Sequence, residues 1–230
     1  MNDELFHIVN KRTFLIALLE ATFIVILPIW GYILKDIPGV NEFLIGVIPR
    51  DLQHIYGIFI FPLVHNDLSH LFGNVIALYV LLLLLKNSFS PYYYRIIACG
   101  WVFPGIFIWL IGNSNTMHIG ASGLVYHLAF FIFWIGVVIR HPNFIAQSLI
   151  VIFLYGGFFW GILPLFPEVS WEGHLGGFIS GTLQALILYK PISMLYPKQE
   201  EEEDEDDAPP DWYEEENDNI IDFRDTKKNN

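Results

Sequence analysis

The sequence is poor in charge and in cysteine. Charged residues make up 16% of its 230 residues, against about 25% in soluble domains. The single cysteine, Cys99, excludes a disulfide within the chain. Outside residues 199–230 there are nine acidic and nine basic residues, so the body of the chain offers no net cationic charge to nucleic acid. These shortages argue against a soluble domain, a disulfide scaffold and a nucleic-acid-binding protein.

Long apolar runs are what the chain has instead. Hydrophobic residues make up 54% of it, and the mean hydropathy is +0.46. Several runs reach about 20 residues, which is enough to cross a bilayer core of roughly 30 Å as a helix. The first run is too long for a signal-peptide core, so we expect it to be retained. The predicted fold class is an all-α polytopic membrane protein with helices near 14–34, 70–86, 92–112, 122–140, 143–164 and 174–190.

Composition divides the chain into three segments. We predict a cytoplasmic N-terminal segment over residues 1–13, a six-helix membrane domain over 14–195 and an acidic, disordered cytoplasmic tail over 196–230. Fifteen acidic and three basic residues fall in the last 32 positions. The tail is expected to be solvated. The alternative is a short interaction motif around Trp212 and Phe223, whose partner is unknown.

The distribution of lysine and arginine predicts the orientation. Seven of these residues lie in the N-terminal segment, the second and fourth connections and the stretch after the last helix. The first connection holds two, and the third and fifth hold none. By the positive-inside rule both termini are then cytoplasmic. The connections 35–69, 113–121 and 165–173 are expected on the outer side.

Polar residues at the starts of three predicted helices fall at one depth. With this topology Ser122, His174 and the pair His70 and Asn74 all lie in the outer third of the bilayer. All three helices run from outside to inside. Polar groups within a membrane are expensive and therefore suggest a function.

Ser122 stands in the stretch GASG, between Gly120 and Gly123. Taken alone, a serine at this place is typical of a helix N-cap. Glycines also let a second backbone or a substrate approach closely. The free N–H groups of a helix start suit a developing oxyanion, so a nucleophilic role is the alternative.

His174 is accompanied by Gly173, Gly177 and Gly181, which recur every four residues. Such a stripe lets one helix approach another closely. If the partner is the helix that begins at Ser122, the imidazole comes within hydrogen-bond reach of the serine and can accept its proton. The alternative is a packed histidine bonded to a backbone carbonyl.

His70 and Asn74 are four residues apart and share one helical face. Two such donors can bind an oxyanion, or they can make hydrogen bonds between helices that only fix the packing. Tyr126 is placed to pack on the His174 ring. No acidic residue is positioned as a third member, which favours a dyad over a triad.

Together these residues resemble the signature of the rhomboid family of intramembrane serine proteases. GASG at 120–123, His174 followed by glycines, and His70-x-x-x-Asn74 occur in the family's order. The resemblance covers residues 10–195 and implies a six-transmembrane-helix rhomboid-like bundle in the bacterial plasma (inner) membrane. It also implies a serine endopeptidase, without cofactor or metal, that cleaves transmembrane protein substrates in the lipid bilayer near its outer face.

The resemblance also implies a role for each residue. Ser122 would be the nucleophile, and His174 the general base and acid. His70, Asn74 and the Ser122 backbone N–H would form the oxyanion hole. Supporting roles are implied for Tyr126, Gly120, Gly123 and His65.

Two other functional classes stay open. A non-catalytic rhomboid-like protein that binds membrane-protein clients would share the fold, but such members typically lack the serine or the histidine. A transporter or metal site is suggested by five histidines on the outer side, although HExxH is absent and no carboxylate stands at ligand spacing. Glu20 and His127 lie inside predicted helices, and the sequence gives neither a role.

Overall fold

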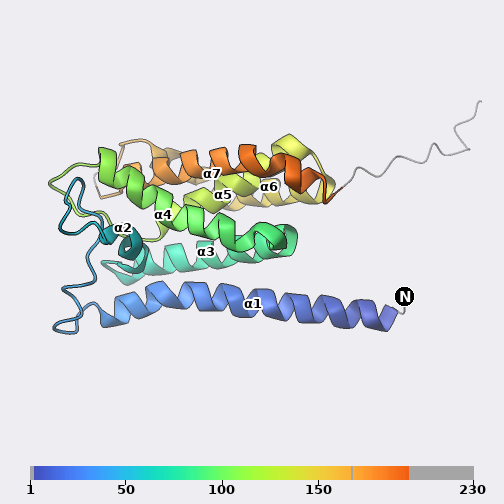
Figure 1. Ribbon diagram of the computed structural model, residues 1–230, viewed down its shortest axis with the longest axis horizontal. Coiled ribbons are helices and arrows are strands. Elements are labelled where there is room, and N and C mark those ends of the chain that lie inside the picture. The colour runs from blue at the N-terminus through green and yellow to red at the C-terminus, as the bar shows by residue number, and fades with distance from the viewer. Residues whose placement is uncertain (1–2, 167, 197–230) are drawn as a thin grey trace, which may run out of the picture. The chain divides into compact units, whose positions relative to one another are not determined.

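The computed structural model describes residues 3–166 and 168–196, so the predicted acidic tail beyond Tyr196 lies outside the described residues. All regular elements within these ranges are helical (Figure 1). The α-helices are α1 Asp3–Leu34, α2 Gly57–Ile60, α3 Leu68–Phe89, α4 Tyr93–Ile111, α5 Ser122–Ile139, α6 Pro142–Tyr155 and α7 Trp171–Ser193. The 3-10 helices are η1 Phe61–Leu63, η2 Ser90–Tyr92 and η3 Gly156–Ile162.

The six predicted helices correspond to α1, α3, α4, α5, α6 and α7. The predicted helix at 143–164 was wrong in its second half. Here α6 ends at Tyr155 and the chain continues as η3 to Ile162. Glycine is a poor helix former, and Gly156, Gly157 and Gly161 fall in this segment. The apolar run is continuous through them, so hydropathy alone does not show where the α-helix ends.

Three stretches are long and apolar enough to cross a membrane: Lys11–Leu34, Leu68–Ile111 and Ser122–Ile139. The second of these contains both α3 and α4. Helix α6 is apolar but has only 14 residues. Glycines and polar residues lower the hydrophobicity of α7. A membrane crossing by all six helices therefore stays a prediction.

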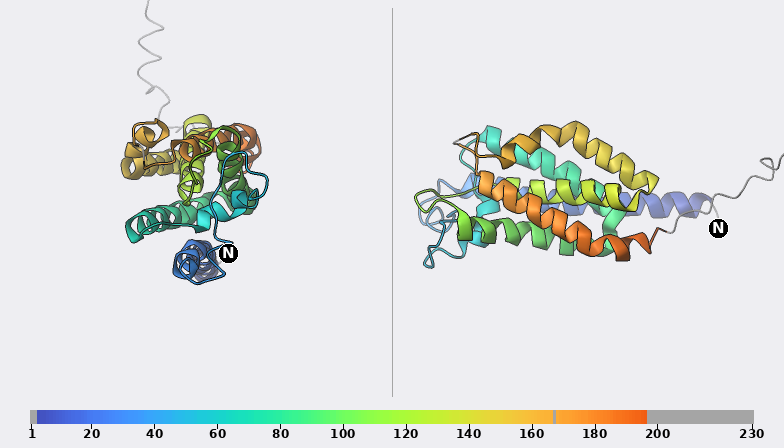
Figure 2. Two further views of the ribbon diagram at one scale, coloured as in Figure 1. Left: turned by 90° about the vertical axis from the view of Figure 1, so that its left-hand side faces the viewer. Right: turned by 90° about the horizontal axis from the view of Figure 1, so that it is seen from above.

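Helix α5 is the centre of the bundle and packs against α3, α4, α6 and α7. Its core side chains, including Leu128, Phe131 and Ile135, are fully buried. Helix α1 lies to one side and packs on α3 (Figure 2). Its outward side chains Leu19 and Phe23 are exposed, as expected for a surface that faces lipid rather than water.

The glycine stripe brings α7 against α5, as predicted. A Cβ atom built on Gly177 would overlap the carbonyl oxygen of Gly123, and one on Gly181 would overlap that of His127. Gly173 instead faces Ile108 of α4. The two helices can approach this closely only because no side chain stands between their backbones.

The start of α1 and the end of α7 lie at one end of the bundle, and the long connections lie at the other (Figure 1). The connection between α1 and α3 is held in place by polar contacts with the end of α4. The Arg50 guanidinium donates to the carbonyls of Leu110 at 3.1 Å and Gly112 at 2.8 Å. Trp109 Nε1 donates to the Asp51 carbonyl at 3.1 Å.

Candidate active site

Ser122 is the first residue of α5 and stands after a sharp turn. Gly120 has φ +104°, a left-handed conformation that favours glycine. Ala121 occupies the N-cap position, and no side chain caps this helix. Ser122 is therefore not the N-cap of α5, the role that is typical of a serine at such a place. Its hydroxyl is used elsewhere, because Ser122 Oγ lies 2.8 Å from His174 Nε2.

His174 is the fourth residue of α7, and both of its ring nitrogens are engaged. Nδ1 lies 2.9 Å from the Gly161 carbonyl oxygen in η3. A carbonyl can only accept, so Nδ1 carries the proton and the lone pair of Nε2 faces the serine hydroxyl. The Tyr126 ring stacks on the imidazole with centroids 4.0 Å apart and an interplanar angle of 10°. The ring is thus fixed in tautomer and in plane.

His70 and Asn74 lie in the first two turns of α3, which begins at a cap formed by Asp67. The Asp67 carboxylate accepts the His70 backbone N–H at 2.9 Å. A Cβ built on Gly120 would lie 2.6 Å from His70 Nε2 and 3.4 Å from Asn74 Nδ2. The two side chains therefore flank the turn that leads into Ser122.

His65 lies behind this pair and is 1% exposed. Its Nε2 accepts from Asn74 Nδ2 at 3.0 Å and from the Ala121 backbone N–H at 3.4 Å. Burial lowers the pKa of His65 to about 4, which keeps the ring neutral and Nε2 free to accept. His65 thus orients the Asn74 amide and ties it to the turn before Ser122.

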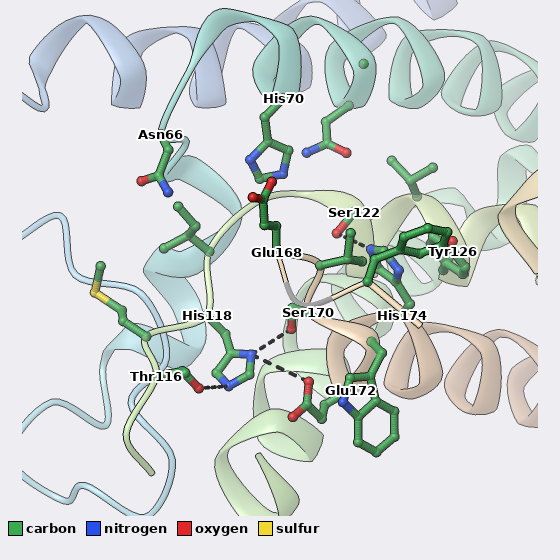
Figure 3. A pocket seen from close by; sticks show the side chains of 18 of the residues that line it. Asn66, His70, Thr116, His118, Ser122, Tyr126, Glu168, Ser170, Glu172 and His174 are labelled. Atoms are coloured by element: carbon green, nitrogen blue, oxygen red, sulfur yellow. Dashed lines mark hydrogen bonds and ion pairs between the residues drawn. The ribbon is translucent and has the colours of Figure 1, made fainter. Parts of the chain in front are cut away.

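Except for His65, the side chains of this site line one cavity of about 980 Å³ (Figure 3). Ser122 and Tyr126 line it from α5, His174 from α7, and His70 and Asn74 from α3. Gly123 takes no part in the lining; a Cβ there would lie 2.8 Å from the Pro104 side chain, so this glycine serves helix packing. Ser122 thus faces a cavity together with His174, His70 and Asn74.

Sequence reasoning missed several neighbours of Ser122 and His174. The Gly161 carbonyl could not be foreseen, since it depends on η3. Ser170 caps α7 by accepting the Gly173 backbone N–H at 3.3 Å, and a serine followed two residues later by an acidic residue is a signal that could have located this helix start. Glu172 and His118 line the cavity beside it.

Glu20 and His127, the two ionisable residues for which the sequence indicated no role, have partners within the bundle. Glu20 faces Lys86 of α3, with Oε2 and Nζ 2.7 Å apart. His127 is fully buried and bonds Ser180 Oγ at 2.7 Å and Gln184 Oε1 at 2.8 Å, both on α7. Within residues 3–166 and 168–196, no group of three or more His, Cys, Asp or Glu side chains is placed to hold a metal ion.

Comparison with known families agrees with the motif pattern. The family model of the Rhomboid domain matches residues 52–191, which is more than half of the chain. The chain belongs to the rhomboid family. The match spans the elements α2 to α7 and includes every residue of the cavity described above. The apolar helices of the chain and its Rhomboid domain together identify the chain as an integral membrane protein.

The similar relatives are mycobacterial and carry no assigned function. An uncharacterized protein of Mycobacterium bovis is 34% identical over 154 residues, covering 64% of each chain. An uncharacterized protein of Mycobacterium leprae is 36% identical over 145 residues, covering 60% of this chain and 57% of its own. This rhomboid-family chain thus spans less than two thirds of the length of the curated relatives it matches.

Proposed function

We propose that this protein is an intramembrane serine endopeptidase that cleaves transmembrane substrates near the outer membrane face. The observation that carries the proposal is the contact between Ser122 Oγ and His174 Nε2 at 2.8 Å. The other ring nitrogen, His174 Nδ1, donates a hydrogen bond to the Gly161 carbonyl. A hydroxyl facing the free lone pair of a fixed imidazole is the arrangement that activates serine as a nucleophile.

The first chemical step forms the bond between Ser122 Oγ and the carbonyl carbon of the substrate, while the hydroxyl proton passes to His174 Nε2. When the tetrahedral intermediate collapses, its C–N bond breaks and the leaving amine takes that proton. Water then repeats the sequence on the acyl-enzyme and frees Ser122. The positive charge that forms on the His174 ring is stabilised through Nδ1 by the Gly161 carbonyl.

The negative oxygen of the intermediate needs donors beside Ser122. His70, Asn74 and the Ser122 backbone N–H are proposed for this task, because the two side chains flank the same turn. His65 would support them by fixing the Asn74 amide. Such donors act strongly where water is scarce.

We further propose that both termini are cytoplasmic and that the cavity opens to the outer side of a bacterial plasma membrane. The charge distribution supports this orientation. The start of α1 and the end of α7 lie together at the end of the bundle opposite the long connections (Figure 1). Water would enter from that side. The substrate helix would unwind locally, since a helical amide is shielded by its own hydrogen bonds.

The test is a cleavage assay in liposomes with single-span reporters. Each reporter carries a Gly-Pro or an Ala-Leu pair in the outer third of its span, and products are mapped by mass spectrometry. We expect cleavage of the first reporter, lost in Ser122→Ala and His174→Ala. Binding of reporters without any cleavage would favour the alternative, a non-catalytic protein that holds membrane-protein clients.

A further inference from the structure

His118 joins the two loops that carry the proposed dyad, and the proposed function gives it no part. It lies four residues before Ser122, and its ring contacts Ser170, which lies four residues before His174. His118 Nδ1 and Ser170 Oγ are 2.7 Å apart. Figure 3 shows the His118 ring between the loop that leads to Ser122 and the start of α7.

The hydrogen bonds around this ring have one consistent direction. Thr116 Oγ1 donates to the Asn113 carbonyl at 2.9 Å, so its oxygen accepts from His118 Nε2 at 3.1 Å. His118 Nδ1 is then the acceptor, and the Ser170 hydroxyl donates a hydrogen bond to it. The Ser170 oxygen in turn accepts the Gly173 N–H. The chain of bonds thus requires neutral His118 and ends on the backbone next to His174.

The backbone of His118 is also held by hydrogen bonds, so the position from which its ring projects is fixed. Its N–H donates to the Val47 carbonyl and its carbonyl accepts the Val47 N–H, both at 2.9 Å. The side chain is 6% exposed, and its two ring nitrogens are engaged by Thr116 and Ser170. His118 therefore connects three segments: the first connection, the loop before α5 and the first turn of α7.

We propose that His118 is a positioning residue that holds the loop before Ser122 against the first turn of α7 and so sets the geometry between Ser122 and His174. The inference rests on the proposed function, because it assigns His118 a task in that reaction. Displacing reacting groups by about 1 Å can cost about 100-fold in rate. A link located four residues from each dyad member is suited to preventing such a shift.

Protonation would weaken this link. Burial lowers the pKa of His118 below its ordinary value, while the Glu172 carboxylate opposes that shift. Glu172 Oε2 lies 3.8 Å from Nδ1 on the α7 side. The nearby cation is Arg50 of the first connection, which donates to the carbonyl of Gly112; a Cβ on Gly112 would lie 3.1 Å from His118 Nε2. Once Nδ1 carries a proton, the Ser170 hydroxyl must turn away, and its oxygen faces two donors instead of one.

The experiment compares wild type, His118→Ala and His118→Asn in the reporter assay across pH. Asparagine places an amide oxygen near the position of Nδ1 and does not titrate. We expect His118→Ala to lose about 10- to 100-fold in kcat with little change in KM. His118→Asn should retain most of the activity, and its acid limb should contain one ionisation fewer than that of wild type. Ser114→Ala, an exposed change in the same loop, is the matched control.

Equal kcat and equal acid limbs in folded His118→Ala and wild type would overturn the positioning role while leaving the protease proposal intact. Wild type that cleaves no reporter would count against the protease itself. Nitrogen-15 spectra of the histidine rings then decide the structural link. Relative to wild type, we expect the chemical shifts of His174 Nδ1 and Nε2 to change far less in His118→Asn than in His118→Ala. Unchanged His174 signals in both variants would contradict the inference.

Discussion

Gly161→Ala is the substitution that tests the orientation of the proposed base most sharply. A Cβ on Gly161 would overlap Tyr126 Oη and lie 3.0 Å from His174 Nδ1. The segment must therefore move away, and the carbonyl that accepts the Nδ1 proton moves with it. A hydrogen bond to a charged group stabilises by about 1.5–3 kcal/mol. Losing it as the ring becomes cationic lowers kcat by about 10- to 100-fold.

The matched control is Gly157→Ala, because a Cβ there has no atom within 4 Å although the residue lies in the same 3-10 segment. We expect the control to cleave the reporter within about twofold of wild type, since a change without new contacts leaves the barrier nearly unaltered. The double variant Gly161→Ala with Tyr126→Phe should recover part of the loss, because the overlapping hydroxyl is gone. If Gly161→Ala is folded and retains wild-type kcat, the carbonyl does not orient His174 and this reasoning fails.

Three further outcomes follow from the packing and the cavity. Asn74→Ala should lower the cleavage rate by about 10²- to 10³-fold, measured with the same reporter; an effect confined to KM would remove it from the oxyanion hole. Gly177→Ala should destabilise the protein by about 1–3 kcal/mol through overlap with the α5 backbone, measured by unfolding in detergent, whereas Gly73→Ala, which meets no atom within 4 Å, should be neutral or stabilising. His127→Leu should cost about 1–3 kcal/mol because its buried partners lose a hydrogen bond; unchanged stability would show that this network contributes nothing.

The helices were predictable because lipid allows few backbone conformations. Apolar runs located five of them within a few residues at most ends, although α1 begins well before the predicted start. The exception was the segment after Tyr155, where hydropathy carries no information about the difference between α and 3-10 geometry. The approach of α7 to α5 was also predictable, because glycines at every fourth position leave a flat face.

The candidate site was predictable only in part. Helix order and depth placed Ser122, His174, His70 and Asn74 on one side of the membrane, and the structure brings them around one cavity. Contacts made by the backbone and by loops were not accessible from the sequence. The bond from Gly161 to His174 depends on a turn, and that from His118 to Ser170 joins residues 52 positions apart. Neither leaves a periodic pattern.

The central claim is that Ser122 is an activated nucleophile, and labelling by a fluorescent fluorophosphonate tests it most directly. Purified protein in detergent is treated beside Ser122→Ala and His174→Ala, with a known active rhomboid protease labelled in parallel. The account predicts that wild type is labelled at Ser122 and that neither variant is. Absence of label on folded wild type, while the reference protease reacts, would contradict it.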